Sequence, residues 1–177
     1  MRRIVVTGLG AATPMGFGAP ALWEGLAQGR SAIGPLRRFD PSTFPSQVGG
    51  EVPEFKITDY VPKSYRKSTK IMARDIELAV VAADFAVRDA RVATRGMLES
   101  GGEGILANGF FKPDPTRVGC NIGSGLICAD MDELTAALDQ ARDPDGRFSI
   151  RRWGRKDDPT KNSGMDDLTP LWMLTYL

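Results

Sequence analysis

The sequence contains no histidine, so the most common general base and metal ligand of enzyme sites is absent from it. Its two cysteines, Cys120 and Cys128, are too few for a disulfide framework, and their spacing is not that of a metal site. Neither sign of charge dominates, because 23 basic residues stand against 22 acidic ones. No apolar run reaches the roughly 18 residues that a spanning helix needs. These absences exclude a disulfide-stabilised secreted protein, a general nucleic-acid binder and a membrane-embedded protein, and we expect a cytoplasmic location.

The composition is that of a soluble globular domain. Of the 177 residues, 42% are hydrophobic and 25% are charged, which suffices for one sizeable core. A basic cluster between Arg147 and Lys156 is followed by Asp157 and Asp158. We interpret this cluster as a solvated loop, with an anion site as the alternative, and we predict no metal site.

The pattern at the N-terminus predicts the start of an α/β unit. Residues 4–7 are a β-branched run typical of a strand buried on both faces of a sheet. A glycine-rich turn follows, and a helix is predicted from about Pro20 until Gly29 stops it. Further strands are predicted at 47–52 and at 117–122.

Two more helices are predicted farther along the chain. Between 70 and 90 apolar residues recur every three or four positions around most of the circumference, so we expect a central helix. A shorter amphipathic helix is predicted at 130–141, with Asp130 as its N-cap. The segments 92–115 and 142–166 are predicted to be loops or insertions.

The turn after the first strand is open to a second interpretation. Gly8-Leu-Gly-Ala-Ala-Thr13 resembles a dinucleotide-binding fingerprint, in which glycines let the backbone approach a pyrophosphate at a helix N-terminus. Here Thr13 replaces the third glycine, Pro14 follows, and the helix begins only near Pro20. We therefore favour a structural turn and expect no nucleotide cofactor, with a nucleotide-binding oxidoreductase domain as an alternative.

No nucleophile is assigned within the sequence. Ser124 lies between Gly123 and Gly125, but the nucleophile-elbow pattern needs glycines two residues before and after the serine. Cys120 is expected to be an inert core residue of an apolar strand. Cys128 lies near a predicted helix start, but no histidine is present to act as its base.

Several segments, taken in order, together resemble one family. They are VVTGLGAATPMG at 5–16, LWEGLAQGRSAIGP at 22–35, and the shorter stretches at 38–40, 44–45, 50–52, 117–119 and 122–125. These segments resemble the N-terminal part of the β-ketoacyl-acyl carrier protein synthases, closest to the type II condensing enzymes of fatty acid synthesis. The resemblance extends over most of the chain apart from 92–115 and 142–166.

The resemblance implies an α/β protein with the thiolase-like fold, in which layers of helix and sheet alternate as α/β/α. Residues 1–177 would then be an incomplete N-terminal half of that fold, with insertions at 92–115 and 142–166. The family acts as a homodimer, takes its acyl groups from acyl carrier protein, and uses no metal or nucleotide cofactor. Neither nucleic acid nor a membrane is implied as a partner.

The family's chemistry uses a cysteine nucleophile and two histidines, and the resemblance implies that all three lie beyond Leu177. No catalytic residue is therefore assigned here. The residue after the family's Gly-Ser-Gly turn lines the acyl-chain pocket, and in this sequence it is Leu126. An ordinary core leucine is the alternative for this position.

The expected function is that of a 3-oxoacyl-[acyl-carrier-protein] synthase, an acyltransferase of fatty acid or polyketide biosynthesis. Its family catalyses decarboxylative Claisen condensation of acyl thioesters with malonyl-acyl carrier protein. We expect residues 1–177 to be a fragment that is inactive by itself. The alternative is a genuine short, non-catalytic protein that binds a full-length synthase relative.

Overall fold

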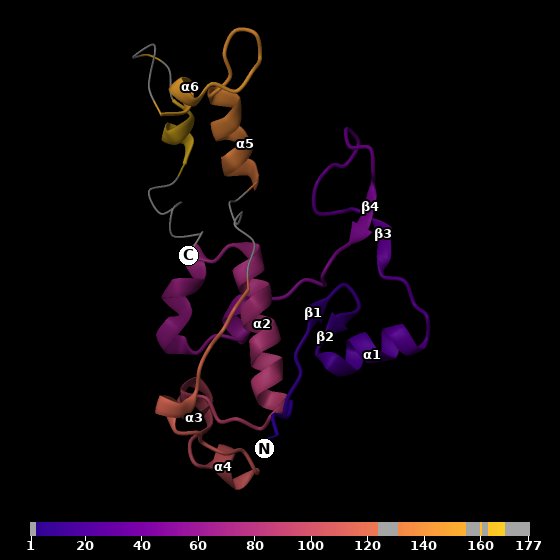
Figure 1. Ribbon diagram of the computed structural model, residues 1–177, viewed down its shortest axis with the longest axis vertical. Helices are drawn as coiled ribbons and strands as arrows, with labels where there is room; N and C mark the ends of the chain where they lie inside the picture. The colour runs from indigo at the N-terminus through magenta and orange to yellow at the C-terminus, as the bar shows by residue number, and fades with distance from the viewer. Residues whose placement is uncertain (1–2, 124–130, 155–159, 161–162, 169–177) are drawn as a thin grey trace. The chain divides into compact units, whose positions relative to one another are not determined.

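The computed structural model describes residues 3–123, 131–154, 160 and 163–168. The chain divides into two compact units (Figure 1). The first unit contains residues 1–70 and 76–121, and the second contains residues 71–75 and 122–177. Among the described residues, no helix has the length and apolar character needed to cross a membrane.

The first unit holds most of the described secondary structure. Its α-helices are α1 (Ala19–Ala27), α2 (Arg74–Asp89, in this unit from Ile76 on), α3 (Arg95–Gly101) and α4 (Gly104–Ala107). Its 3-10 helices are η1 (Ile57–Asp59), η2 (Lys63–Ile71, in this unit to Lys70) and η3 (Pro115–Arg117). The predicted insertion at 92–115 thus folds into α3 and α4.

The described strands form two separate antiparallel pairs in the first unit. β1 (Ala12–Thr13) pairs with β2 (Gly16–Phe17), and β3 (Ile33–Pro35) pairs with β4 (Val48–Gly50). β4 lies within the predicted strand 47–52, so that prediction is confirmed. In the tight β1–β2 turn Gly16 has a φ of 128°, a value that favours glycine.

The predicted strands at 4–7 and 117–122 do not form ladders with any described residue, and this corrects the sequence interpretation. Ile4 is fully exposed, and Val118 is 58% exposed. A run of β-branched residues indicates that a segment can adopt a strand conformation. A ladder also needs a second backbone at hydrogen-bonding distance. In this structure the first segment instead leads into residues 8–10, which lie against α2.

Aromatic rings hold the centre of the first unit together. Phe17 of β2 stacks on Phe85 of α2, with ring centroids 6.3 Å apart. Phe55 packs edge-on against both Phe17 and Tyr60, with ring centroids 5.5 and 6.0 Å apart. Such contacts add to the apolar area that the rings bury. They fix the segment around Tyr60 beside α2, where a cavity is found.

Local signals place the helix ends well. α1 begins at Ala19 with Pro20 in its first turn, and Gly29, with a φ of 63°, follows its C-terminus, as predicted. The helix predicted at 70–90 begins later, at Arg74, because the preceding residues form the tighter η2.

The second unit packs three short elements together. They are α5 (Met131–Gln140), α6 (Ile150–Gly154) and η4 (Gly164–Asp167) (Figure 1). Ala137 of α5 and Ala141, which directly follows the helix, are fully buried. A Cβ at Gly164 would lie 2.7 Å from the Ala137 carbonyl oxygen. The helix predicted at 130–141 is confirmed over Met131–Gln140, while its expected N-cap, Asp130, lies outside the described residues. The described part of 142–166 includes α6 and most of η4, so it is less irregular than expected.

Candidate functional site

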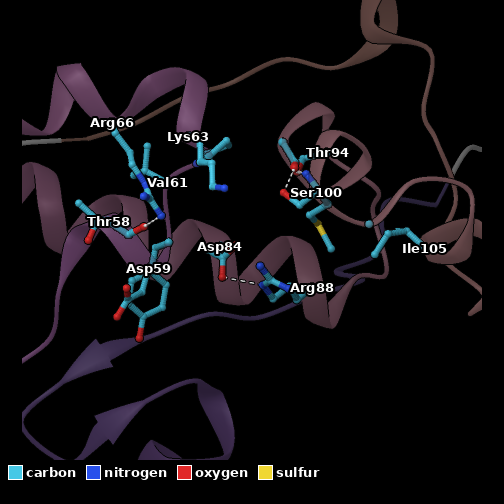
Figure 2. Close-up of a pocket in the computed structure, with 15 residues that line it drawn as sticks. Thr58, Asp59, Val61, Lys63, Arg66, Asp84, Arg88, Thr94, Ser100 and Ile105 are labelled. Atoms are coloured by element: carbon cyan, nitrogen blue, oxygen red, sulfur yellow. Dashed lines mark hydrogen bonds and ion pairs between the residues drawn. The ribbon is translucent and has the colours of Figure 1, made fainter.

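A cavity of about 520 Å³ opens on the first unit. One wall is the chain from Thr58 through Arg66, the second is one turn of α2, and the third is formed by α3 with Ile105 of α4 (Figure 2). Small-molecule sites in proteins have volumes of roughly 300–1,000 Å³. The cavity therefore has the size of a ligand site.

Charged side chains lie around the cavity. The α2 residues Asp84 and Arg88 form an ion pair with 2.7 Å between the carboxylate Oδ2 and the guanidinium Nε. Arg66 donates a hydrogen bond to the Thr58 carbonyl oxygen at 3.4 Å. Lys63 and Asp59 complete the charged set. With three cationic and two anionic side chains, the lining carries one net positive charge.

Two hydroxyl groups on α3 face the same space. Thr94 is the N-cap of α3, and its Oγ1 accepts a hydrogen bond from the Met97 amide at 3.3 Å. Ser100 donates a hydrogen bond to the Gly96 carbonyl oxygen at 2.7 Å. Both groups are held in place by the helix itself, so this wall is preorganised.

Apolar side chains form the remainder of the lining. Val61 and Met97 are only 9% and 8% exposed, and Ile105 is half-buried. Pro62 lies directly against Gly96, where an added Cβ would be 2.2 Å from the proline Cγ. This close approach joins α3 to the chain that precedes η2.

The η2 segment is a basic surface. Its exposed Lys63, Arg66, Lys67 and Lys70 carry four positive charges, and no acidic residue occurs between 63 and 71. Glu99 of α3 is tied to this surface, because it accepts hydrogen bonds from Ser64 Oγ at 3.1 Å and from Arg95 Nε at 2.8 Å. The arrangement suits an acidic partner.

No metal centre is formed within the described part of the chain, where no group of three or more cysteine, aspartate or glutamate side chains is placed to hold an ion. The described cavity offers cations, hydroxyl groups and an apolar wall, which are groups suited to holding a ligand.

Comparison with known proteins decides the family. The family model described as the beta-ketoacyl synthase N-terminal domain matches residues 1–150. The chain belongs to this family. Membership confirms the resemblance and the thiolase-like α/β fold class, of which the described helices and small sheets form an incomplete part.

Individual relatives of this β-ketoacyl synthase chain agree with the family. The 3-oxoacyl-[acyl-carrier-protein] synthase 2 of Synechocystis sp. is 44% identical over 91 residues, which are 51% of this chain and 21% of the relative. The granaticin polyketide putative beta-ketoacyl synthase 2 of Streptomyces violaceoruber is 35% identical over 107 residues, or 60% of this chain and 25% of the relative. The solved structure of the ishigamide ketosynthase/chain length factor is 36% identical, covers 52% of this chain and 22% of that chain, and has a TM-score of 0.45.

The match spans only about a quarter of these curated relatives, with 21% and 25% of their lengths covered. The family match and the names of these relatives associate the chain's family with fatty acid or polyketide biosynthesis.

The residues singled out in the sequence have different outcomes in this β-ketoacyl synthase chain. Leu126, the expected acyl-pocket residue, lies outside the described residues, as do Ser124 and Cys128. Cys120 is a free thiol and is exposed, so the expectation of a core cysteine is wrong. Its segment has no ladder partner among the described residues, and nothing there buries the thiol.

The sequence interpretation missed both the cavity and the basic surface. One signal for the basic surface was present, since Lys63, Arg66, Lys67 and Lys70 occur without an intervening acid. The cavity had no such signal, because its walls come from three separate stretches, 58–66, 84–88 and 94–105, that only packing brings together.

Proposed function

We propose that this chain is part of a 3-oxoacyl-[acyl-carrier-protein] synthase that elongates carrier-bound acyl chains by decarboxylative condensation. The family match over residues 1–150 carries the proposal, and a relative named as such a synthase is 44% identical over 91 residues. In this proposal residues 1–177 are a partial domain with insertions at 92–115 and 142–166, and Leu126 lines the acyl pocket. The complete enzyme is a homodimer.

The proposed partner of this chain is acyl carrier protein, and the proposed docking surface is η2. The four cations of η2 and the absence of any acid within it support this choice. A basic surface of this kind accelerates encounter with an acidic partner and makes binding depend on ionic strength. The proposal therefore requires the carrier to present acidic residues at the contact.

Carrier binding is measured by titrating labelled acyl carrier protein with the purified chain at several salt concentrations. We expect binding that weakens as salt rises and that is lost in the double variant Lys67→Glu, Lys70→Glu. The matched control is Lys112→Glu, an exposed lysine outside η2 that should leave binding unchanged. Equal loss in the control would contradict docking at η2.

The condensation reaction is tested with acyl- and malonyl-acyl carrier protein as substrates and mass spectrometry of the products. We propose that residues 1–177 alone form no product, because the chain contains no histidine to assist decarboxylation. Sustained turnover by the purified chain would refute this part of the proposal. Absence of turnover together with salt-dependent carrier binding would agree with it.

A second candidate function is non-catalytic binding to a full-length synthase relative. The exposed apolar segment near the N-terminus favours it, since Ile4, Val5 and Val6 are 100%, 72% and 78% exposed. An unpaired β-branched segment invites pairing with another chain. Size-exclusion chromatography with a full-length synthase tests this candidate, which requires co-elution, and separate elution removes it.

A further inference from the structure

We propose that the cavity between η2, α2 and α3 binds an amphiphilic monoanion, namely a carboxylate that carries a medium-length aliphatic chain. The carboxylate would meet Lys63, and the aliphatic chain would lie along Val61, Met97 and Ile105. This site goes beyond condensing activity and beyond carrier docking.

The charge of the cavity favours a single negative charge. Asp84 is already neutralised by Arg88 at 2.7 Å. Among the described residues, Lys63 has no carboxylate within ion-pair distance, and Figure 2 shows its side chain reaching into the space between η2 and α3. The net charge of the lining is one positive charge, so a dianion such as a phosphate monoester would keep an uncompensated charge.

The apolar wall favours an aliphatic chain next to that charge. Val61 and Met97 are nearly buried, and Ile105 closes the α4 side of the cavity. Transfer of each methylene group from water to such a wall is favourable. A short carboxylate such as acetate would forgo this contribution, and a long-chain alcohol would leave Lys63 without a partner.

One wall of the cavity comes from the segment 92–115. Thr94, Met97, Ser100 and Ile105 all belong to this segment. The close contact between Pro62 and Gly96 holds it against the η2 side.

The test is an NMR titration of the full chain with octanoate below its micelle-forming concentration, with 1-octanol and acetate as matched ligands. We expect saturable one-to-one binding of octanoate with shifts at α3 and η2, and binding of octanol and acetate about tenfold weaker or more. Absence of saturable octanoate binding, or octanol binding of equal strength, overturns the proposal.

Three variants assign the contacts. Lys63→Gln should weaken octanoate about tenfold, the loss expected for one charge-assisted hydrogen bond, and leave octanol unchanged. Ser100→Leu should obstruct the cavity and weaken both ligands. Lys67→Gln removes a neighbouring charge that does not line the cavity, so it should leave octanoate binding unchanged.

Circular dichroism first checks that each variant keeps the fold of the parent chain. The two cavity variants, Lys63→Gln and Ser100→Leu, change different walls. If one of them does not fold, the other still tests the site. Equal weakening by Lys67→Gln and Lys63→Gln would show nonspecific attraction to η2 and would overturn the site. Carrier protein is absent from this experiment, so failure of the docking proposal would not affect the outcome.

Discussion

Asp89, the last residue of α2, accepts a hydrogen bond from the backbone amide of Leu9 at 2.8 Å, although 80 residues separate them in the chain. The flanking Gly8 and Gly10 lie against α2. A Cβ added at Gly8 would be 2.3 Å from the Ala86 carbonyl oxygen, and one added at Gly10 would be 2.0 Å from the Ala82 carbonyl oxygen. The glycine-rich turn that resembled a phosphate loop thus serves as a packing surface for α2. This finding supports the structural interpretation of the turn.

Replacement of Gly10 by alanine should destabilise the first unit by about 1–3 kcal/mol, the usual cost of forcing extra volume into a packed contact. The added Cβ would meet backbone atoms of α2, which cannot rotate away. Urea unfolding followed by circular dichroism measures the free energy of unfolding. Gly119→Ala is the matched control, since among the described residues no heavy atom beyond its two chain neighbours lies within 4 Å of its added Cβ. Equal stability of the Gly10 variant and the control would refute the close packing.

Removal of the Asp89 carboxylate should loosen the same contact without a steric clash. Asp89→Ala loses the acceptor for the Leu9 amide, and we expect about 1 kcal/mol of destabilisation. Asp89→Asn keeps an acceptor oxygen and should retain part of that stability. Hydrogen exchange of the Leu9 amide reports the contact directly, and exposed Glu103→Ala serves as the control. An unchanged exchange rate in Asp89→Ala would contradict the hydrogen bond.

Glu51 should make the stability of the first unit dependent on acid. Backbone amides of Arg37 and Arg38 both donate to its Oε1 at 2.9 Å, and these two hydrogen bonds hold the pKa of Glu51 below its ordinary value of 4.5. The pKa of Glu51 is lower in the folded chain than in the unfolded chain, so its carboxylate stabilises the fold. This contribution to the free energy of unfolding is complete above the unfolded pKa and is lost as the pH falls through the folded pKa.

The variant Glu51→Gln tests whether the Glu51 carboxylate loses its stabilising effect in acid. We expect the parent chain to be more stable than the variant at neutral pH and the difference to shrink as the pH falls below 4.5. The measurement is the free energy of unfolding against pH for both proteins. Glu54→Gln, which removes an exposed carboxylate 3.6 Å from Arg38, is the control. A difference that stayed constant into acid would contradict the role of the Glu51 charge.

Ser163 should be important for the second unit alone. It forms a capping box with Asp166 at the start of η4, with 2.7 Å from the Ser163 amide to Asp166 Oδ2 and 2.9 Å between the two side chains. Ser163→Ala should cost about 1 kcal/mol. Hydrogen exchange should then increase in α5 and η4 but not in α1, and Thr135→Ala on the exposed face of α5 is the control. Faster hydrogen exchange in both units would contradict the prediction that Ser163 stabilises the second unit alone.

Predictions from the sequence succeeded where the signal was local. Proline in the first turn and glycine after the last turn located α1, and apolar periodicity located α5. These signals depend on residues within one or two turns of each other, so the sequence order alone presents them. The ordered family motifs were likewise readable, and the family match over residues 1–150 confirmed them.

The predictions that were wrong concern features that depend on contacts between distant parts of the chain. Residues 4–7 have the composition of a strand, yet a ladder needs a second backbone, and the neighbouring glycines lie on α2 instead. Cys120 lies between Val118 and Ile122 in the chain but is exposed, because burial is decided by what packs over a side chain.

By itself the sequence determined the family, the α/β class, the positions of the main helices and the absence of histidine. Tertiary structure alone decided that Gly8 and Gly10 pack on α2 and that Lys63, Arg88 and Met97 line one cavity. The physical reason is the range of the interactions. Helix propensity, capping and periodicity act between near neighbours, whereas burial, strand pairing and cavity formation depend on which remote segments come into contact.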